Sequence, residues 1–239
     1  MTSITSIEFF YDPISPYAYL AFEQLPRALE GLSYHVSYTP ILFGALLKAY
    51  AHLGPAEIAP KREWTYRQVL WQAKAQGVDF QMPCQHPFPP LPLLRLAAAC
   101  ADEHGHTNRW VTQQLFHHVW RGGADAADAG RLQALSAQLA HKFGVNAAPD
   151  SDKAKACLRA NTDRALQAGL FGVPSLVVGG KVFWGLDSLP MLRECLERDP
   201  WFDQGGAWEG AAQVGVGTSR LPIGAARPEP TALRPNHSA

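Results

Sequence analysis

The chain has 239 residues, a length that suits one large domain or a smaller domain carrying an insertion. It carries 21 Lys and Arg against 21 Asp and Glu, so its formal net charge is zero, and 47% of its residues are hydrophobic. This balance argues against nucleic-acid binding and a polybasic membrane anchor, and the apolar content excludes global disorder. No apolar run is long enough to span a membrane, and residues 1–11 lack the basic start of a secretory signal. We therefore expect a cytoplasmic protein.

The N-terminal part of the sequence predicts a strand, a helix and a second strand. Residues 6–11 are aromatic and β-prone, and they end at the turn-forming Asp12-Pro13. Ser15 is a favoured N-cap and Pro16 suits the first helical position, after which apolar residues recur at helical spacing. Residues 33–42 predict the second strand. Such a β-α-β order is typical of two parallel strands joined by a crossover helix.

The middle of the chain predicts helices, with Gly- and Pro-containing breakers between them. Alternating β-branched runs are scarce there, which argues against a β-sandwich. We expect an all-helical insertion. Its predicted helices are 45–52, 62–76, 93–103, 108–120, 129–143 and 153–168.

The C-terminal part predicts a β-hairpin, a helix and a tail. Residues 175–178 and 182–184 are β-prone, and Gly179-Gly180 between them forms a good two-residue turn. A last helix is predicted over 188–197. Residues 203–239 contain six Gly and four Pro without a long periodic stretch, which predicts a flexible tail.

Without the helical block, the remaining elements follow the order of a thioredoxin-like domain. The predicted fold class is therefore α/β, a thioredoxin-like domain with a large all-helical insertion. The thioredoxin-like domain would be discontinuous, and the predicted divisions are 1–43 with 158–202, 44–157 for the insertion, and 203–239 for the tail.

The cysteines do not form a redox or zinc motif. Cys84, Cys100, Cys157 and Cys195 are widely spaced, with no C-x-x-C pair. Such thiols are typical of small buried side chains. The four histidines between residues 104 and 118 match no common metal-ligand spacing, so we expect no metal site.

Three segments could carry chemistry. A helix N-terminus stabilises an anion or a thiolate, and the Ser15 hydroxyl would add a hydrogen bond, although Ser15 could equally be only an N-cap. Pro174, placed before an edge strand, would leave backbone groups free for an extended peptide, although Pro also suits a plain entry into a strand. Asp187 or Ser188 at the last helix could bind the ammonium and carboxylate of an amino acid, or simply cap the helix.

These segments match known motifs when they are taken together. Residues 11–20 read YDPISPYAYL, residues 171–175 read FGVPS and residues 183–187 read FWGLD. In this order they resemble motifs of the kappa-class glutathione transferases and the 2-hydroxychromene-2-carboxylate isomerases, in the DsbA-like branch of the thioredoxin superfamily. Residues 86–96 and 120–125 resemble signatures of that family's insertion. The resemblance covers residues 5–200.

The resemblance implies glutathione as the cofactor. Ser15 stands where DsbA-like oxidoreductases have their first Cys and Ala18 where they have the second, so glutathione would supply the sulfur. Ser15 would be the catalytic residue. Pro174 is commonly cis in this fold, and Val173 before it would pair its backbone with the cysteinyl part. The residues implied for the cofactor are Ser15, Pro16, Tyr17, Val173 and Pro174, with Trp184, Gly185, Leu186 and Asp187 at the γ-glutamyl end.

The resemblance also implies a substrate and a reaction. Lys48 and Lys61 match family lysines near substrate or peptide carboxylates, and His52 stands where relatives often have Asn. The implied activity is the interconversion of 2-hydroxychromene-2-carboxylate and trans-o-hydroxybenzylidenepyruvate in the breakdown of naphthalene-like aromatics. The alternatives are a kappa-like glutathione transferase or peroxidase, and a non-enzymatic thioredoxin-like binding protein. The expected partners are a small aromatic substrate and a second copy in a homodimer, with no nucleic acid and no membrane.

Overall fold

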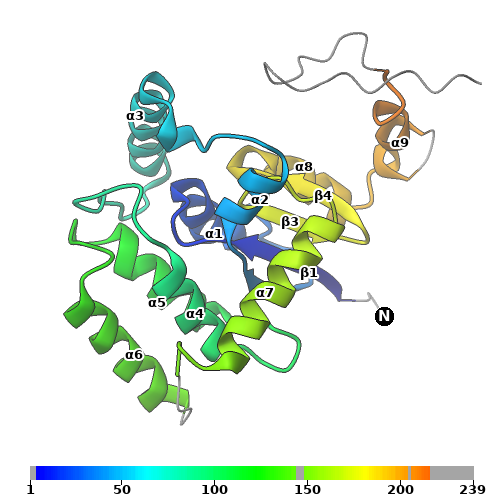
Figure 1. The fold of residues 1–239 in the computed structure, drawn as a ribbon. Helices are drawn as coiled ribbons and strands as arrows, with labels where there is room; N and C mark the ends of the chain where they lie inside the picture. Colours follow the sequence, from blue (N-terminus) through cyan, green and yellow to red (C-terminus); the bar gives the residue numbers. More distant parts are fainter. Residues whose placement is uncertain (1–3, 144–147, 204–205, 216–239) are drawn as a thin grey trace, which may run out of the picture. The chain divides into compact units, whose positions relative to one another are not determined.

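The computed structural model describes residues 4–143, 148–203 and 206–215. The chain divides into two compact units, Met1–Glu197 and Arg198–Ala239. The described part of the first unit contains a four-stranded sheet with the strand order β2-β1-β3-β4 (Figure 1).

The predicted β-α-β start is confirmed. β1 (Thr5–Tyr11) pairs in parallel with β2 (Tyr34–Pro40), and α1 (Pro16–Ala28) forms the crossover between them. The predicted hairpin is also confirmed. β3 (Ser175–Val178) and β4 (Lys181–Trp184) are antiparallel around Gly179 and Gly180, whose φ angles of 54° and 82° suit glycine. β3 also pairs antiparallel with β1.

The predicted helices form, with shifted ends. The bounds are α2 (Phe43–Ala49), η1 (Pro55–Glu57), α3 (Ala59–Gln76), α4 (Leu91–Ala99), α5 (Arg109–Trp120), α6 (Ala129–Phe143), α7 (Asp152–Gln167), η2 (Leu186–Ser188) and α8 (Leu189–Leu196). The predicted stretch 93–103 is too long. α4 ends at Ala99 because the Asp102 carboxylate accepts the backbone N–H groups of His104 and His106 in a turn.

Both faces of the sheet are buried, which explains the apolar character of β1. Phe9 contacts the ring of Tyr38 on β2, and Tyr11 contacts Phe116 of α5, so α1 and α5 cover this face. Phe10 points to the opposite face and packs with Leu46 of α2 and Ala165 of α7. The sheet therefore brings its central strand, β1, and the turn that follows it between two helical layers.

The predicted domain division stays a prediction. Met1–Glu197 forms one compact unit, and α7 runs across the expected boundary between residues 157 and 158. In the second unit, η3 (Pro200–Phe202) and α9 (Ala207–Ala211) are formed, and the rings of Trp201, Phe202 and Trp208 contact one another. The flexible tail predicted over 203–239 also stays a prediction, since residues 204–205 and 216–239 lie outside the described residues.

Candidate active site

Ser15 lies at the N-terminus of α1, directly after the central strand β1. Its Oγ accepts the N–H of Ala18 at 3.2 Å, so Ser15 is the N-cap, and Pro16 occupies the first turn. The same hydroxyl donates to the backbone carbonyl of Val173 at 3.3 Å. Ser15 is 8% exposed, so its hydroxyl is nearly enclosed by protein. The sequence left open whether Ser15 is only an N-cap or also a site residue. In the structure Ser15 is the N-cap of α1, and its hydroxyl hydrogen points to Val173 in the second motif.

The Val173–Pro174 bond is cis, as the resemblance implied. The carbonyl of Pro174 accepts the N–H of Gly185 at 2.9 Å, which joins the second motif to the third. The N–H of Val173 has no hydrogen-bond partner within the described part of the chain. The prediction that an edge strand follows Pro174 is wrong, because β3 is held between β1 and β4. Only the backbone before β3 is open to a ligand.

The third motif forms a tight turn at the end of β4. Gly185 has a φ of 92°, and a Cβ on it would collide with the Asp187 carboxylate, so only glycine fits there. Asp187 is exposed and has no ion pair within the described residues. Ser188 precedes α8 without a side-chain cap, and its hydroxyl donates to the Gly185 carbonyl instead. The Leu186 side chain is buried, so only its backbone could meet a ligand.

An aromatic pair lies beside the cis proline. The rings of Phe171 and Trp184 have centroids 4.9 Å apart, and each side chain is about half exposed, at 49% and 52%. The indole of Trp184 lies so close to Gly172 that a Cβ there would collide with it. The sequence predicted Trp184 as a site residue but missed Phe171, which was visible only as part of the second motif.

Tyr17 connects the helix N-terminus to α3. Its hydroxyl donates to Oε1 of Gln68 at 2.6 Å. The pKa of Tyr17 is raised by burial and also by the nearby negative charge of Asp187, which brings the first and third motifs into one electrostatic environment. Gln68 was missed because no motif marks it. Lys61 is seven residues before Gln68 and so shares its face of α3.

Two of the predicted substrate residues are not joined to this site. Lys48 lies in the last turn of α2 and His52 in the turn after it, and both are exposed. Neither has a side-chain hydrogen bond or an ion pair within the described residues. Their roles therefore stay predictions.

Asp12 supports the turn that carries Ser15. This carboxyl is fully buried, and its two oxygens accept the N–H groups of Ile14 at 3.1 Å and Phe43 at 3.0 Å. Burial raises the pKa of Asp12 to about 7, and the two backbone N–H groups act in the opposite direction. The carboxyl thus links the turn to the start of α2. The sequence marked Asp12 only as a turn residue.

Two further side chains hold the same turn. The indole N–H of Trp120, at the end of α5, donates to the carbonyl of Pro13 at 2.9 Å. His86 Nε2 lies 2.8 Å from the carbonyl of Ile14, and since a carbonyl only accepts, Nε2 must carry a hydrogen. Burial lowers the pKa of His86, so the ring is neutral near pH 7. Its Nδ1 lies 2.7 Å from the hydroxyl of Tyr66 on α3.

The model of the DSBA-like thioredoxin domain family matches residues 6–197. The chain belongs to this family. It is 28% identical over 200 residues to a 2-hydroxychromene-2-carboxylate isomerase of Sphingobium xenophagum, with 80% of this chain and 97% of that protein covered. It is 26% identical over 205 residues to glutathione S-transferase kappa 2 of Caenorhabditis elegans, covering 80% of this chain and 91% of that protein.

Solved structures of DsbA-like proteins confirm the thioredoxin-like fold. A 2-hydroxychromene-2-carboxylate isomerase structure superposes with a TM-score of 0.68 at 19% identity, covering 88% of this chain and 100% of that one. This DsbA-like chain has Ser at position 15 and Ala at position 18. In the described part of the chain, no helix is both long and apolar enough to cross a membrane.

Proposed function

We propose that this protein is a glutathione-dependent isomerase of the 2-hydroxychromene-2-carboxylate type. The observation that carries the proposal is the Ser15 hydroxyl, which lies at the N-terminus of α1 and points to the backbone of Val173 beside the cis proline. A hydroxyl donor at a helix N-terminus suits a thiolate. Residues 15 and 18 are Ser and Ala, and the family resemblance implies that a bound glutathione supplies the thiolate instead.

The residues around Ser15 fit the groups of glutathione. The unpaired N–H of Val173 suits a carbonyl of the cysteinyl residue. The exposed Asp187 carboxylate, which has no ion pair within the described residues, suits the ammonium of the γ-glutamyl end. The relative named glutathione S-transferase kappa 2 supports the same cofactor.

The interconversion requires opening of the hemiketal ring, in which the ring C–O bond breaks and the proton of the 2-hydroxyl passes to the phenolate, and rotation about a double bond. When bound, glutathione would supply the thiolate that adds to the conjugated system, makes this bond single and then leaves. Ser15 would turn its hydroxyl hydrogen from the Val173 carbonyl to the sulfur, and the N-terminus of α1 would favour the ionised thiol. Each unit by which these groups lower the thiol pKa corresponds to about 1.4 kcal/mol. Because Asp12, His86 and Trp120 hold the turn, the donors would need little reorganisation.

A kappa-like glutathione transferase or peroxidase is the second candidate, favoured by the similarity to the kappa-class transferase of Caenorhabditis elegans. It would use the same thiol site for net conjugation. We further propose a cytoplasmic homodimer that acts on a small aromatic substrate.

Three measurements on the purified protein distinguish these candidate functions. Calorimetric titration with glutathione should give heat, whereas a non-enzymatic binding protein should give none. Absorbance should show glutathione-dependent interconversion of 2-hydroxychromene-2-carboxylate and trans-o-hydroxybenzylidenepyruvate. Conjugation of glutathione to 1-chloro-2,4-dinitrobenzene without that interconversion would favour the transferase and contradict the isomerase.

A further inference from the structure

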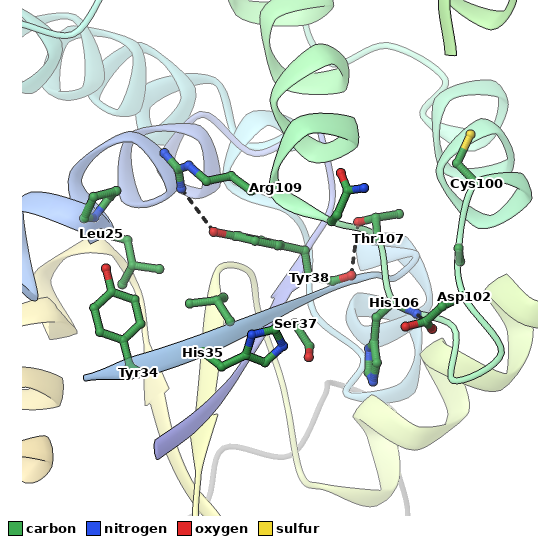
Figure 2. Close-up of a pocket in the computed structure, with 14 residues that line it drawn as sticks. Leu25, Tyr34, His35, Ser37, Tyr38, Cys100, Asp102, His106, Thr107 and Arg109 are labelled. Atoms are coloured by element: carbon green, nitrogen blue, oxygen red, sulfur yellow. Dashed lines mark hydrogen bonds between the residues drawn. The ribbon is translucent and has the colours of Figure 1, made fainter. Parts of the chain in front are cut away.

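A groove of about 740 Å³ runs along the outer edge of β2 (Figure 2). One side is made by β2 residues 34–38, the other by residues 100–102 and 106–109, and one end by Leu25 and Pro26 of α1. None of the candidate active-site residues lines it. The groove therefore needs its own explanation.

The edge of β2 offers unpaired backbone groups to this groove. β2 is the outermost strand, so alternate residues direct their N–H and C=O groups away from β1. Tyr38 is one of them, because it exchanges two backbone hydrogen bonds with Thr107, at 3.4 and 2.7 Å. By the two-residue period, Val36 and Tyr34 point the same way. Within the described residues, neither of them has a partner on this side.

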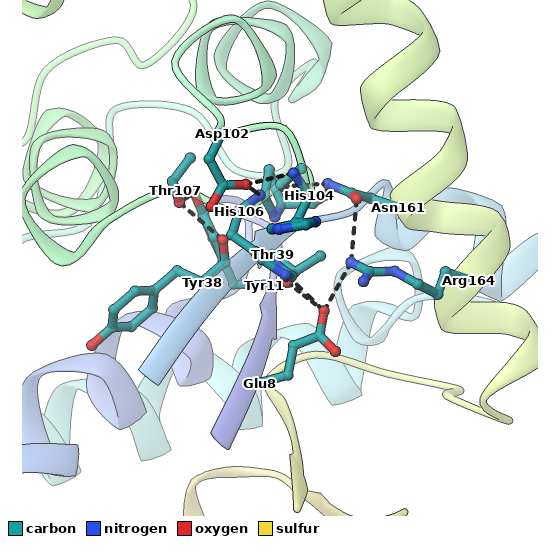
Figure 3. A network of polar contacts seen from close by, with 12 residues as sticks. Glu8, Tyr11, Tyr38, Thr39, Asp102, His104, His106, Thr107, Asn161 and Arg164 are labelled. Atoms are coloured by element: carbon teal, nitrogen blue, oxygen red, sulfur yellow. Dashed lines mark hydrogen bonds and ion pairs between the residues drawn. The ribbon is translucent and has the colours of Figure 1, made fainter. Parts of the chain in front are cut away.

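The chain itself cannot extend the pairing that Thr107 begins. Asn108 is still extended and caps α5, with its side chain accepting the N–H of Val111 at 2.9 Å, and α5 begins at Arg109, so the pairing with β2 stops at Thr107. The segment before Thr107 is firmly held (Figure 3). Asn161 of α7 donates to the carbonyl of Gly105 at 2.8 Å, and His106 Nδ1 lies 2.9 Å from the hydroxyl of Thr39. The edge of β2 at Val36 and Tyr34 thus stays unpaired within the described residues.

Arg109 supplies a positive charge in this groove and Asp102 supplies a negative one. Arg109 lines it, and its guanidinium lies over the ring of Phe22 and donates to the hydroxyl of Tyr38, without an ion pair in the described residues. Glu23 also lies near Arg109, but it pairs with His117 and Arg121. Asp102, which also lines the groove, accepts two backbone N–H groups of its own loop.

We propose that this groove binds an extended peptide segment of a partner protein, which adds to β2 as an antiparallel strand. The segment would exchange backbone hydrogen bonds with Val36 and Tyr34, in the register that Thr107 begins. An acidic side chain opposite Val36 would lie on the face of Arg109, because directly paired residues share a face. A small apolar side chain opposite Tyr34 would lie toward the end of the groove where Pro26 is exposed. A second copy of β2 is a poorer occupant, since antiparallel pairing would bring two Arg109 side chains toward each other.

The test uses the full chain and the peptide acetyl-Glu-Thr-Val-Lys amide, with fluorescein on the Lys side chain so that no residue before Glu meets Asn108, followed by fluorescence anisotropy. N-methylation of the Glu nitrogen removes a donor that faces β2, whereas N-methylation of the Thr nitrogen removes one that faces away. We expect the first change to weaken binding about fivefold to tenfold, the effect of about one net hydrogen bond, and the second to leave it nearly unchanged. Replacing Glu by Gln in the peptide should also weaken binding, by an amount that decreases with salt.

A variant of the protein tests the same backbone hydrogen bonds by changing β2 instead of the peptide. Val36→Pro removes one outward N–H, and proline is tolerated on an edge strand where that group faces solvent. This variant should bind the peptide more weakly, while its far-UV circular dichroism spectrum stays the same as that of the wild type. Equal affinity of the two N-methylated peptides would overturn the proposal, as would no binding at millimolar peptide. If sedimentation shows a dimer and the Val36→Pro variant is monomeric, the edge of β2 binds a second copy of the chain. That result would also overturn the proposal.

Discussion

At the residue scale, Ser15 has one hydroxyl hydrogen and two functions that depend on its oxygen. The oxygen caps α1 by accepting from Ala18, and the hydrogen is directed to the Val173 carbonyl. Loss of the side chain therefore affects helix stability and any thiolate at the site by different amounts. Two substitutions separate these effects.

Ser15→Ala and Ser15→Gly should both lower isomerase turnover by about tenfold to about a hundredfold, the effect of a hydrogen bond to a charged group. Only alanine should also lower the melting temperature clearly, because glycine is tolerated at an N-cap. The measurements are steady-state kinetics with saturating glutathione and thermal unfolding. Wild-type turnover in both variants would mean that Ser15 is only a cap.

Asp187→Asn should weaken glutathione binding by roughly 1.5–3 kcal/mol, because the exposed carboxylate would no longer pair with the ammonium group. Calorimetry measures this loss. Glutathione without its free amine should bind the wild type and the variant equally weakly. Asp163→Asn, an exposed acid on α7, is the control and should bind as the wild type does. Unchanged affinity in Asp187→Asn would make Asp187 a structural residue.

Asp12 should make stability depend on pH. Its pKa rises from 3.8 to about 7 on folding because the carboxyl is buried, so the protonated form is favoured in the native state. This contribution is complete below the unfolded pKa and is lost as the pH rises through about 7. The free energy of unfolding of the wild type should therefore fall relative to that of Asp12→Asn between about pH 4 and pH 7, by at most about 1.4 kcal/mol per pH unit.

Urea unfolding of the two proteins across this range measures the difference. Asparagine does not titrate, so the stability of the variant depends on pH only through the other ionisable groups. The variant is therefore the reference for the wild type. A difference between the two free energies that stays constant from pH 4.5 to pH 8 would contradict the raised pKa of Asp12.

Single residues differ in how far the sequence could predict them. Ser15 was predictable because an N-cap has a local pattern, and the cis Pro174 because its motif is distinctive. The buried state of Asp12 was not predictable, because it depends on α2 packing over the turn from a distant part of the chain. Gln68 has no local pattern at all, since only the fold brings α3 to Tyr17.

At the scale of elements, the turn between β1 and α1 is held by segments that are far apart in sequence. Its carbonyl groups at Pro13 and Ile14 accept from Trp120 of α5 and from His86 before α4. The middle of the chain, predicted as an insertion, therefore supports the candidate site directly.

Trp120→Phe should lower the free energy of unfolding by about 1–3 kcal/mol, because it leaves the buried Pro13 carbonyl without its donor while keeping an aromatic ring. Turnover should fall as well, since the turn loses one support. Urea unfolding gives the measurement. Trp64→Phe, on an exposed part of α3, is the matched control and should change little. Equal stability of the two variants would show that this hydrogen bond does not hold the turn.

The helices and strands also show which features of the fold local sequence patterns can predict and which they cannot. Helix periodicity predicted the helices to within a few residues, and Gly179-Gly180 predicted the hairpin. Strand order was beyond local reasoning. Pro174 suggested an edge strand, but β3 lies inside the sheet because β1 pairs with its other side, a contact between residues more than 160 positions apart.

At the scale of the whole molecule, Met1–Glu197 is one compact unit whose sheet is buried on both faces. Truncation after Gly215 removes residues outside the described part and keeps η3 and α9. The melting temperature and glutathione affinity should stay nearly unchanged, because the core and the predicted site lie within residues 4–197. Differential scanning fluorimetry and calorimetry check this. A loss of fold or binding would give the removed segment a structural role.

The most direct test of the account is the initial rate of interconversion of 2-hydroxychromene-2-carboxylate and trans-o-hydroxybenzylidenepyruvate at increasing glutathione concentration. S-methylglutathione is the matched control, because it keeps the peptide and blocks the thiol. We predict a rate that saturates with glutathione, is absent with S-methylglutathione, and is at least about tenfold lower in Ser15→Ala. A rate that does not depend on glutathione, or that S-methylglutathione supports equally well, would contradict it.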